Sequence, residues 1–588
     1  MKQLGTLKQD SHHPGSDKSV HFFFLPILLL IVSVVSSQAQ EFLLLDPTGY
    51  PGEKRLPLME PRPSDNPPGL ILPVQPAVKN KTDPVPIPEI MVREIVVTGN
   101  TVFSDLELGQ ITAPYLNRLL TNEMLDEIRH TLTLHYINNG YVNSGAIIPD
   151  QAVVDGKLIF NIIEGRISQI VVKGNKWFRK EYIADRICLD AGPALNIGTL
   201  QKRLQQLQQD QRIDHVQAEL KPGVTLGESL MKVEVEEKNP YQILFGYDNY
   251  QAPTIGAERG LATLIHQNLT GHGDILNLTG VASEDNDPQM DFWYTLPITS
   301  QDTTLTVSYR KNDLDIREEP FETLDIVSES EVFQITLRHP FYRTLTQEFA
   351  MAFSGENNKN KAFLLGEPFS FSPGAVDGES INTVLRFAQE WTHRTRKQVV
   401  AARSKFSFGI NEMNATIHDN DLPDGRFFAW LGQIQWAGRL DALDTQLIFR
   451  TDLQLSNDSL LGLEQIAVGG RYSVRGYREN QMVRDQALIT SVEARVPLIR
   501  ERGWTEYLQL AAFFDFGAAW NKFLTTPSPN NISSIGLGLR WAGILMKSPF
   551  EIRPKFEIYW GCPLRDVDTP GGNLQDHGIH FQFVVKNF

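Results

Sequence analysis

The carboxy-terminal part of the chain, residues 239–588, alternates apolar and polar side chains with a period of two. In the segment TQLIFRTDLQLS, 445–456, one face is apolar and the other carries Arg450, Asp452 and Gln454. A period of two is that of a β-strand rather than a helix. A dry protein core would not accept such a charged face unpaired. The pattern therefore predicts strands with lipid on one side and water on the other, as in a transmembrane β-barrel.

A soluble antiparallel sandwich or barrel would also alternate in this way. The amino terminus favours the membrane alternative. Its apolar run at 22–35 follows three lysines and precedes a small-x-small site at Ser37 and Ala39, the pattern of a secretory signal peptide. The run is short for a spanning helix, which needs about 20 apolar residues. We predict a signal peptide over 1–39, with a retained anchor as the alternative.

The overall composition excludes several classes of function. The net charge of −15 at pH 7 argues against general binding of nucleic acid. The sequence contains no H-E-x-x-H, G-x-S-x-G or C-x-x-C motif and no nucleotide-binding G-x-x-x-x-G-K-[ST]. The two cysteines, Cys188 and Cys562, fall in different predicted domains, so we expect no disulfide. We expect no enzymatic activity, no cofactor and no metal site.

The region between the signal peptide and the strands contains a linker and an internal repeat. Residues 40–86 are rich in proline and predict an extended linker without a core. After it, VREIVVTGNTVF at 92–103 matches ISQIVVKGNKWF at 167–178 with a constant offset of 75 residues. Each copy reads as a strand that ends in a Gly-Asn turn. The turn residues are Gly99, Asn100, Gly174 and Asn175.

Each copy of the repeat continues with one helical face and closes with a strand. The closing strands are expected at 156–165 and 230–238. We therefore predict two small α+β domains, module 1 at 87–165 and module 2 at 166–238, before a barrel at 239–588. The helical faces are formed by Leu125, Ile128 and Leu132 in the first copy and by Leu200, Leu204 and Leu207 in the second.

Two motifs in the barrel region resemble those of a known family. The segment LEQIAVGGRYSVRGYREN, 463–480, contains the tetrad V-R-G-Y, and FFDFG, 513–517, matches F-x-D-x-G. With the order of linker, two modules and strands, they resemble the two-partner secretion transporters of the haemolysin secretion/activation family, whose periplasmic modules are POTRA domains. The matching residues are Val474, Arg475, Gly476 and Tyr477 in the first motif and Phe513, Asp515 and Gly517 in the second.

The resemblance implies a fold of about 16 antiparallel transmembrane strands preceded by two α+β POTRA-like domains. It also implies that the sixth external loop folds back into the lumen, where Arg475 pairs with Asp515. The residues agree, because Asp515 is in phase with Phe513 and Gly517 and opposite to two lipid-facing phenylalanines. A guanidinium can bind a carboxylate through two parallel hydrogen bonds. The loop is then a lumenal latch; the alternative is an exposed arginine loop that pairs with nothing.

The family further implies an outer-membrane transporter that recognises and secretes a large partner protein of adhesin or haemolysin type. Its POTRA-like domains would lie in the periplasm and bind the amino-terminal region of the partner by adding a strand to a sheet edge. The closing strands, around 159–163 and 233–235, are the candidate edges. An outer-membrane assembly insertase and a passive porin are the alternatives. The pore-plugging helix of many family members is in doubt, because prolines interrupt 41–61.

Overall fold

The computed structural model describes residues 69–71, 89–189, 192, 194–283, 286, 288–319, 321–441, 444–546, 551–569 and 571–587. The predicted signal peptide, the segment 41–61 and the predicted linker apart from 69–71 lie outside these ranges.

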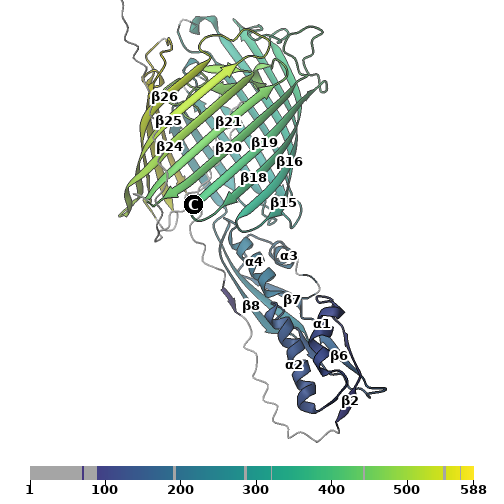
Figure 1. Ribbon diagram of the computed structural model, residues 1–588. Helices are drawn as coiled ribbons and strands as arrows, with labels where there is room; N and C mark the ends of the chain where they lie inside the picture. The colour runs from purple at the N-terminus through teal and green to yellow at the C-terminus, as the bar shows by residue number, and fades with distance from the viewer. Residues whose placement is uncertain are drawn as a thin grey trace, which may run out of the picture. The chain divides into compact units, whose positions relative to one another are not determined.

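Sixteen long antiparallel strands close into a barrel, in which each strand pairs with the next along the chain (Figure 1). The first and last strands complete the ring, with Tyr247 opposite Phe583. The predicted fold class is confirmed. The strands are β10 (Tyr241–Asp248), β11 (Arg259–His266), β12 (Ile275–Ser283), β13 (Gln289–Pro297), β14 (Thr304–Asp315), β15 (Ile326–Arg343), β16 (Gln347–Leu364), β18 (Glu379–Arg394), β19 (Gln398–Ile410), β20 (Phe428–Leu440), β21 (Thr445–Ser456), β24 (Gln486–Arg502), β25 (Thr505–Trp520), β26 (Asn531–Gly543), β27 (Ile552–Pro563) and β28 (Ile579–Asn587). The short β17 (Glu367–Pro368) pairs only with the end of β16.

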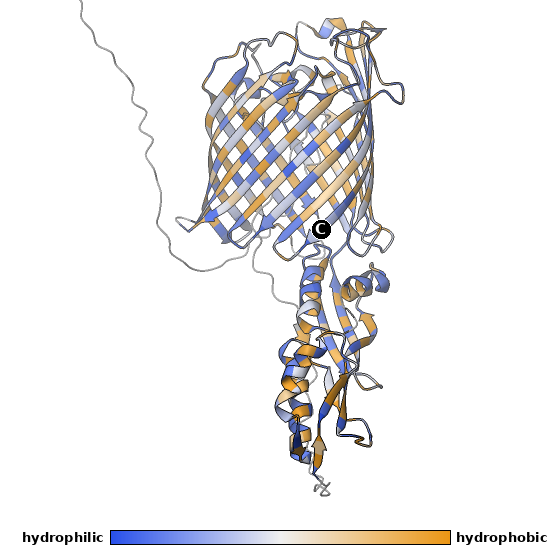
Figure 2. Ribbon diagram, turned by 45° about the vertical axis from the view of Figure 1, so that its right-hand side comes forward, coloured by the Kyte–Doolittle hydropathy of each residue, from blue (hydrophilic) through white to orange (hydrophobic). Residues whose placement is uncertain are grey.

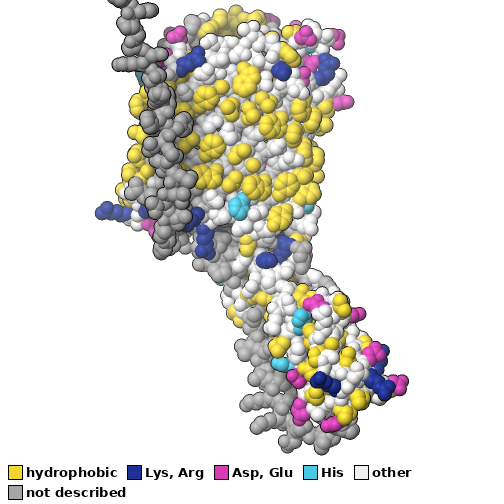
Figure 3. Space-filling model, viewed as in Figure 1, with side chains coloured by type: hydrophobic (Ala, Val, Ile, Leu, Met, Phe, Trp, Pro, Cys, Tyr) yellow, Lys and Arg dark blue, Asp and Glu magenta, His cyan; other side chains and the backbone are white. Residues whose placement is uncertain are grey.

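The two faces of the barrel wall differ in chemistry. Hydrophilic and hydrophobic residues alternate along the strands (Figure 2). On the face seen in Figure 3, hydrophobic side chains cover the wall and charged ones gather toward its two ends. In β26, Ile535, Leu537 and Leu539 are exposed on the outside, whereas Ser534 and Arg540 are buried. The lipid-facing side is therefore apolar, and the charges face inward.

No helix in the described ranges is both long and apolar enough to cross a membrane. Cys188 and Cys562 are both exposed and form no disulfide.

Module 1 packs two helices on a small sheet with the order β3-β6-β5. The helix α2 buries Ile128, Leu132 and Tyr136 against Leu158 and Phe160 of the central strand. The elements are β2 (Ile90–Val92), β3 (Glu94–Thr98), α1 (Asp105–Thr112), β4 (Arg118–Leu120), α2 (Asn122–Asn138), β5 (Gly145–Ile147) and β6 (Lys157–Ile163), with β2 paired to β4.

Module 2 repeats this arrangement around Leu200, Leu204 and Leu207 of α4. Its sheet has the order β1-β8-β9-β7, and the added strand comes from the proline-rich region. Leu70 of that strand packs against the core of module 2. The elements are β7 (Arg166–Lys173), α3 (Lys180–Cys188), α4 (Ile197–Gln208), β8 (Ile213–Pro222), β9 (Glu228–Glu237) and β1 (Gly69–Ile71), which runs parallel to β8.

The predicted sheet edges are wrong. The closing strands β6 and β9 each have a neighbour on both sides and so cannot accept a further strand. The opening strand of each copy, β3 or β7, lies at a sheet edge instead. The chain crosses from β3 to β6, and from β7 to β9, in parallel, which brings the last strand into the middle of the sheet.

The Gly-Asn turn after each opening strand requires glycine. Gly99 and Gly174 have φ angles of 79° and 83°, in the left-handed region. A Cβ atom would lie 2.4 Å from the carbonyl oxygen of Ile162 or of Val235, on the closing strand. Both the backbone angle and the close approach therefore exclude a larger residue.

The asparagine that follows each glycine closes the turn. The side-chain amide of Asn100 donates to the carbonyl of Phe103 at 3.0 Å, and that of Asn175 donates to Phe178 at 2.8 Å. Each turn also binds a glutamate at the end of its closing strand. Backbone N–H groups of 101–102 donate to Glu164, and those of 176–178 donate to Glu237. The repeat thus encodes the same carboxylate-capped turn twice.

We expect Glu164→Gln to lower the free energy of unfolding of module 1 by about 2 kcal/mol, the usual worth of hydrogen bonds to a charged group. The carboxylate accepts from Thr101 at 2.7 Å and Val102 at 2.9 Å. Burial acts to raise the pKa of Glu164, but hydrogen bonds from Thr101 and Val102 hold that pKa below its ordinary value. The stabilisation is therefore present at neutral pH and is lost as the pH falls through the lowered pKa.

Hydrogen–deuterium exchange of β6 in the full-length protein measures this effect at neutral and acidic pH. The matched control is Glu94→Gln, on the same module, because Glu94 is exposed and lies 3.5 Å from Lys157. Equal exchange in the two variants at neutral pH would show that the hydrogen bonds to the Glu164 carboxylate do not stabilise module 1.

Candidate functional site: loop six inside the barrel

The connection between β21 and β24, residues 457–485, is here called loop six. It contains a hairpin of β22 (Ile466–Val468) and β23 (Met482–Arg484). Its side chains contact inward-facing residues of the wall, so the loop lies within the barrel. Its own apolar residues form a core with wall residues of β20, β24, β25 and β26. That core consists of Ile466, Val468, Val474, Tyr477 and Met482 from the loop and Leu431, Ala487, Ile489, Ala519 and Ile532 from the wall.

Arg475 binds Asp515 of β25 through two parallel hydrogen bonds. Nε lies 2.7 Å from Oδ2, and Nη2 lies 2.9 Å from Oδ1. The backbone N–H of Arg475 donates to the same carboxylate at 3.1 Å. Nη1 pairs with Glu493 of β24, and the guanidinium carbon lies 3.6 Å from the ring centre of Phe513. The side chains of Arg475 and Asp515 are only 3% and 0% exposed. Each charge is therefore shielded from water and requires a partner of opposite sign.

The remaining motif residues fit loop six against the wall. Val474 packs over Gly517, where an added Cβ would lie 2.9 Å from the Val474 side chain and 2.3 Å from that of Val468. Gly476 has a φ of 93° and lies against Gly561 of β27, since a Cβ on Gly561 would come within 2.7 Å of its Cα. Each motif residue thus has a defined contact with the wall or with the rest of the loop.

Tyr477 closes the tetrad on the barrel wall. Its hydroxyl lies 2.9 Å from the carbonyl of Ser533 and 2.8 Å from that of Arg565, and it accepts from the Arg565 N–H at 3.2 Å. The ring is buried in the core of loop six. Tyr477 therefore joins the loop to β26 and to the external loop after β27.

Two further arginines of loop six bind carboxylates that the sequence did not reveal. Arg471 lies 2.8 Å from Glu557 of β27 and stacks 4.0 Å from the ring centre of Tyr559. Arg478 binds Glu318 at 2.7 Å and Asp576, both in external loops. The apolar–polar alternation of β24 and β27 indicates that Glu493 and Glu557 face inward. Which loop residue each one binds depends on the register of the barrel strands.

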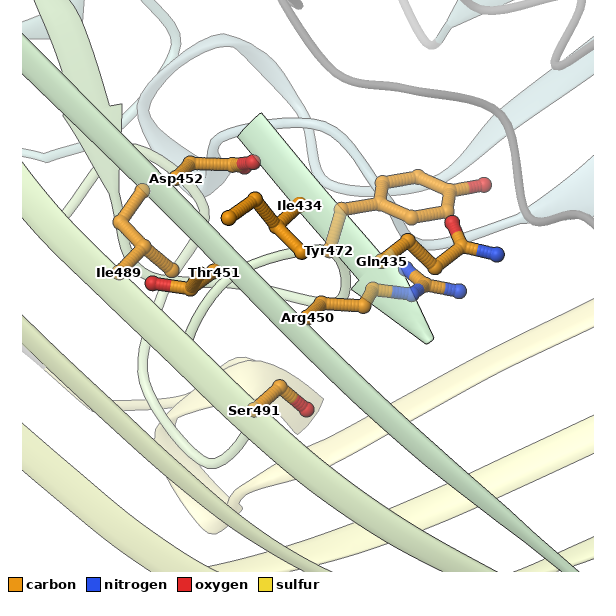
Figure 4. Close-up of a pocket in the computed structure, with 8 residues that line it drawn as sticks. All are labelled: Ile434, Gln435, Arg450, Thr451, Asp452, Tyr472, Ile489 and Ser491. Atoms are coloured by element: carbon orange, nitrogen blue, oxygen red, sulfur yellow. The ribbon is translucent and has the colours of Figure 1, made fainter. Parts of the chain in front are cut away.

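A small pocket remains between loop six and the wall formed by β20, β21 and β24 (Figure 4). Tyr472 of the loop lies beside Gln435 and Arg450 of the wall (Figure 4). The loop therefore leaves polar space beside part of the wall. The pocket is lined by Ile434, Gln435, Arg450, Thr451, Asp452, Tyr472, Ile489 and Ser491.

Comparison with known proteins identifies the barrel and module 1. The family model "Haemolysin secretion/activation protein ShlB/FhaC/HecB" matches residues 227–541, more than half of the chain. The chain belongs to this family. A POTRA domain model of the ShlB type matches residues 90–165, within predicted module 1.

Individual relatives and structures agree with the family. The outer membrane transporter CdiB of Dickeya dadantii (strain 3937) is 22% identical over 412 residues, 67% of this chain and 70% of the relative. The hemolysin transporter protein HpmB of Proteus mirabilis is 24% identical over 202 residues, 33% of this chain and 34% of the relative. The structure of CdiB from Escherichia coli aligns with a TM-score of 0.63 and 20% identity, covering 87% of this chain and 93% of that one.

The predicted family, function and location are therefore confirmed. The chain is an outer-membrane transporter of the two-partner secretion family that secretes a partner protein, and this family is not enzymatic. The family match selects the transporter over the assembly insertase and the passive porin.

We expect Gly517→Ala to displace loop six, because the new Cβ would overlap the side chain of Val468 at 2.3 Å. Trypsin added to the folded protein should then cut after the buried arginines of the loop at least about tenfold faster, the factor that corresponds to 1.4 kcal/mol. Gly355→Ala in β16 is the matched control, since a Cβ there has no atom within 4 Å. Unchanged cleavage in Gly517→Ala would show that this packing does not hold the loop.

Proposed function

We propose that loop six is a releasable latch across the pore, and that the two modules capture the amino-terminal region of a large secreted partner. The observation that carries the first part is the buried ion pair of Arg475 with Asp515 and Glu493. A chain that passes through the lumen has to displace the loop that these contacts fix. The motif residues Val474, Gly476, Tyr477, Phe513 and Gly517 act with that pair by fitting the loop to the wall.

Transport requires an extended partner, because loop six and its side chains occupy the lumen. The sequence has no nucleotide-binding loop of the G-x-x-x-x-G-K-[ST] type, and the driving force proposed here is the folding of the partner. Folding of the partner outside the cell removes it from the pore and prevents its return. Under this proposal the transporter supplies a path and a gate, and the partner supplies the free energy.

Capture of the partner takes place at the free edges of the module sheets. In module 2, β8 is covered by β1, so β7 is the long free edge among the described strands. In module 1, β3 occupies the equivalent place, and the edge strand β5 has only three residues. An extended segment can add to such an edge through main-chain hydrogen bonds. The turns at Gly99–Asn100 and Gly174–Asn175 fix the ends of these two edge strands.

Single prolines along β7, at Ile170, Val171 and Val172, test this assignment. Proline removes one N–H, and successive N–H groups of a strand point to opposite sides. We expect substitutions at alternate positions to weaken binding of the partner's amino-terminal region by about tenfold or more, while the module stays folded. Substitutions facing β9 should unfold the module instead. Binding by all folded variants at full strength would exclude β7 as the capture edge.

The test of the transporter function compares culture medium and outer membrane in three strains: wild type, a deletion of this gene, and Arg475→Ala. The deletion should remove one very large protein from the medium and cell surface. Arg475→Ala should reduce its export about tenfold at normal barrel abundance. Arg310→Ala is the matched control, because Arg310 pairs with Asp291 on the wall at 2.6 Å without contacting loop six in any described bond.

Other outcomes of this comparison have definite meanings. A joint fall of many outer-membrane barrels would indicate a role in assembly. Normal export in Arg475→Ala would contradict the latch and leave the transporter function intact.

A further inference from the structure

Loop six has a further buried ion pair, on other strands of the wall than those that bind Arg475. Glu464, near the start of the loop, binds Arg386 of β18 through two hydrogen bonds, Nη2 to Oε1 at 2.8 Å and Nη1 to Oε2 at 3.1 Å. Asn358 of β16 donates to the same carboxylate at 3.2 Å. The side chains of Glu464 and Arg386 are 1% and 7% exposed. The contact therefore joins the loop to β16 and β18 in a site closed to water.

This site lies across the lumen from the contacts made by residues 471–478, here called the tip of the loop. In the ring of sixteen strands, β16 is the seventh and β27 the fifteenth, so the two strands lie on opposite sides of the barrel. Glu464 is bound at β16 and β18, while Arg471 is bound to Glu557 of β27. The loop is thus fixed to opposite walls and crosses the lumen.

The backbone beside Glu464 is also held in place. The side chain of Gln454, on β21, donates to the carbonyls of Glu464 and Asp485 at 3.1 and 3.0 Å. Asp485 in turn accepts from the Leu460 N–H and the Gln465 side chain, each at 3.0 Å. These bonds join the two ends of the loop to each other and to β21.

The Arg386 site is suited to release. Arg386 also binds Glu356 of β16 with Nε–Oε2 and Nη2–Oε1 distances of 3.0 and 2.8 Å. When Glu464 leaves, the arginine keeps a carboxylate partner, so no unpaired charge remains buried in the wall.

We propose that Glu464 is a second anchor of loop six and that Arg386 is its receptor on the wall. The proposal rests on the latch function of Arg475 and extends it: the loop spans the pore between the Glu464 contact on β18 and a group of contacts made by Arg471, Arg475 and Arg478. Loss of the Arg475 contact weakens the second group while the start of the loop stays attached to β18. Wide opening requires the contacts on both sides of the lumen to break. Glu464 is thus a positioning residue that sets how far the loop can move.

The test is single-channel conductance of the purified full-length protein in planar bilayers, without partner. Glu464→Gln keeps the size of the side chain and removes its charge. We expect Glu464→Gln and Arg475→Ala each to raise the ratio of open to closed time about tenfold, and the double variant to raise it by about the product, since independent contacts add in free energy. The double variant should also show a larger maximal conductance than either single variant.

The matched control is Glu390→Gln. Arg338 binds Glu348 of β16 at 2.6 Å and Glu390 of β18 at 2.8 Å, so it too is an arginine with two carboxylates on the same two strands. Neither carboxylate belongs to loop six. An opening effect of Glu390→Gln equal to that of Glu464→Gln would overturn the proposal, because wall charge alone would then explain it.

Three other outcomes separate the second anchor from the latch. Wild-type gating in Glu464→Gln, with opening in Arg475→Ala, would reject the second anchor and keep the latch. Opening in Glu464→Gln alone would reject the latch role of Arg475. If Glu464→Gln does not fold, Arg386→Lys, which keeps the charge but not the paired hydrogen bonds, should raise the open ratio severalfold. An unchanged ratio in that variant would overturn the proposal.

Discussion

A charge buried inside this barrel is strongly unfavourable without a partner, whether loop six is docked or has moved. Three wall groups that bind loop six have a second partner of opposite charge; Asp515 does not, since Arg475 is the one cation bonded to it among the described residues. Glu493, which binds Arg475, also binds Arg495 at 2.6 Å, and Glu557, which binds Arg471, also binds Arg540 at 2.9 Å. At the opposite wall, Arg386 keeps Glu356. Undocking therefore exchanges contacts without leaving a bare charge on these wall groups, which would otherwise be strongly unfavourable. The same arrangement makes the loop well ordered when docked and able to leave.

The two modules show how a short repeat specifies a local structure. In each, a left-handed glycine, an asparagine that closes the turn and a distant glutamate meet at the end of the opening strand. The glycine is required by a carbonyl of the closing strand, and the glutamate lies at the end of that strand. The repeated Gly-Asn sequence therefore specifies a contact between the first and last strands of a module. Among the described strands, the other side of the opening strand has no neighbour, and it is the edge proposed above for the partner.

Much of this architecture could be predicted from the sequence, for specific reasons. A period of two with charges on one face determines which side of each strand meets lipid. It places Asp515 on the inward side, where the side chain is buried in the structure. The phase of a strand does not give its neighbours in space, so Glu493 as a partner of Arg475, and Glu464 as a partner of Arg386, could not be found. These pairs depend on the register of the closed barrel.

The wrong prediction of the sheet edges has a related cause, since parallel crossovers placed the last strands, β6 and β9, in the middle of their sheets. The sequence indicates Gly517 only as a motif residue. The need for glycine there comes from the side chain of Val468, which packs against it in the folded loop.

The strand β1 makes module 2 a discontinuous domain. Its sheet pairs Gly69 with Gln217, and the whole of module 1 lies between them in the chain. A fragment cut at the boundaries of the repeat, 166–238, would keep α3, α4 and three strands but would lose Leu70 from its core and expose the edge of β8. Bare edges of this kind promote association between copies. The smallest self-contained periplasmic unit of this transporter is therefore the pair of modules together with the segment that precedes them.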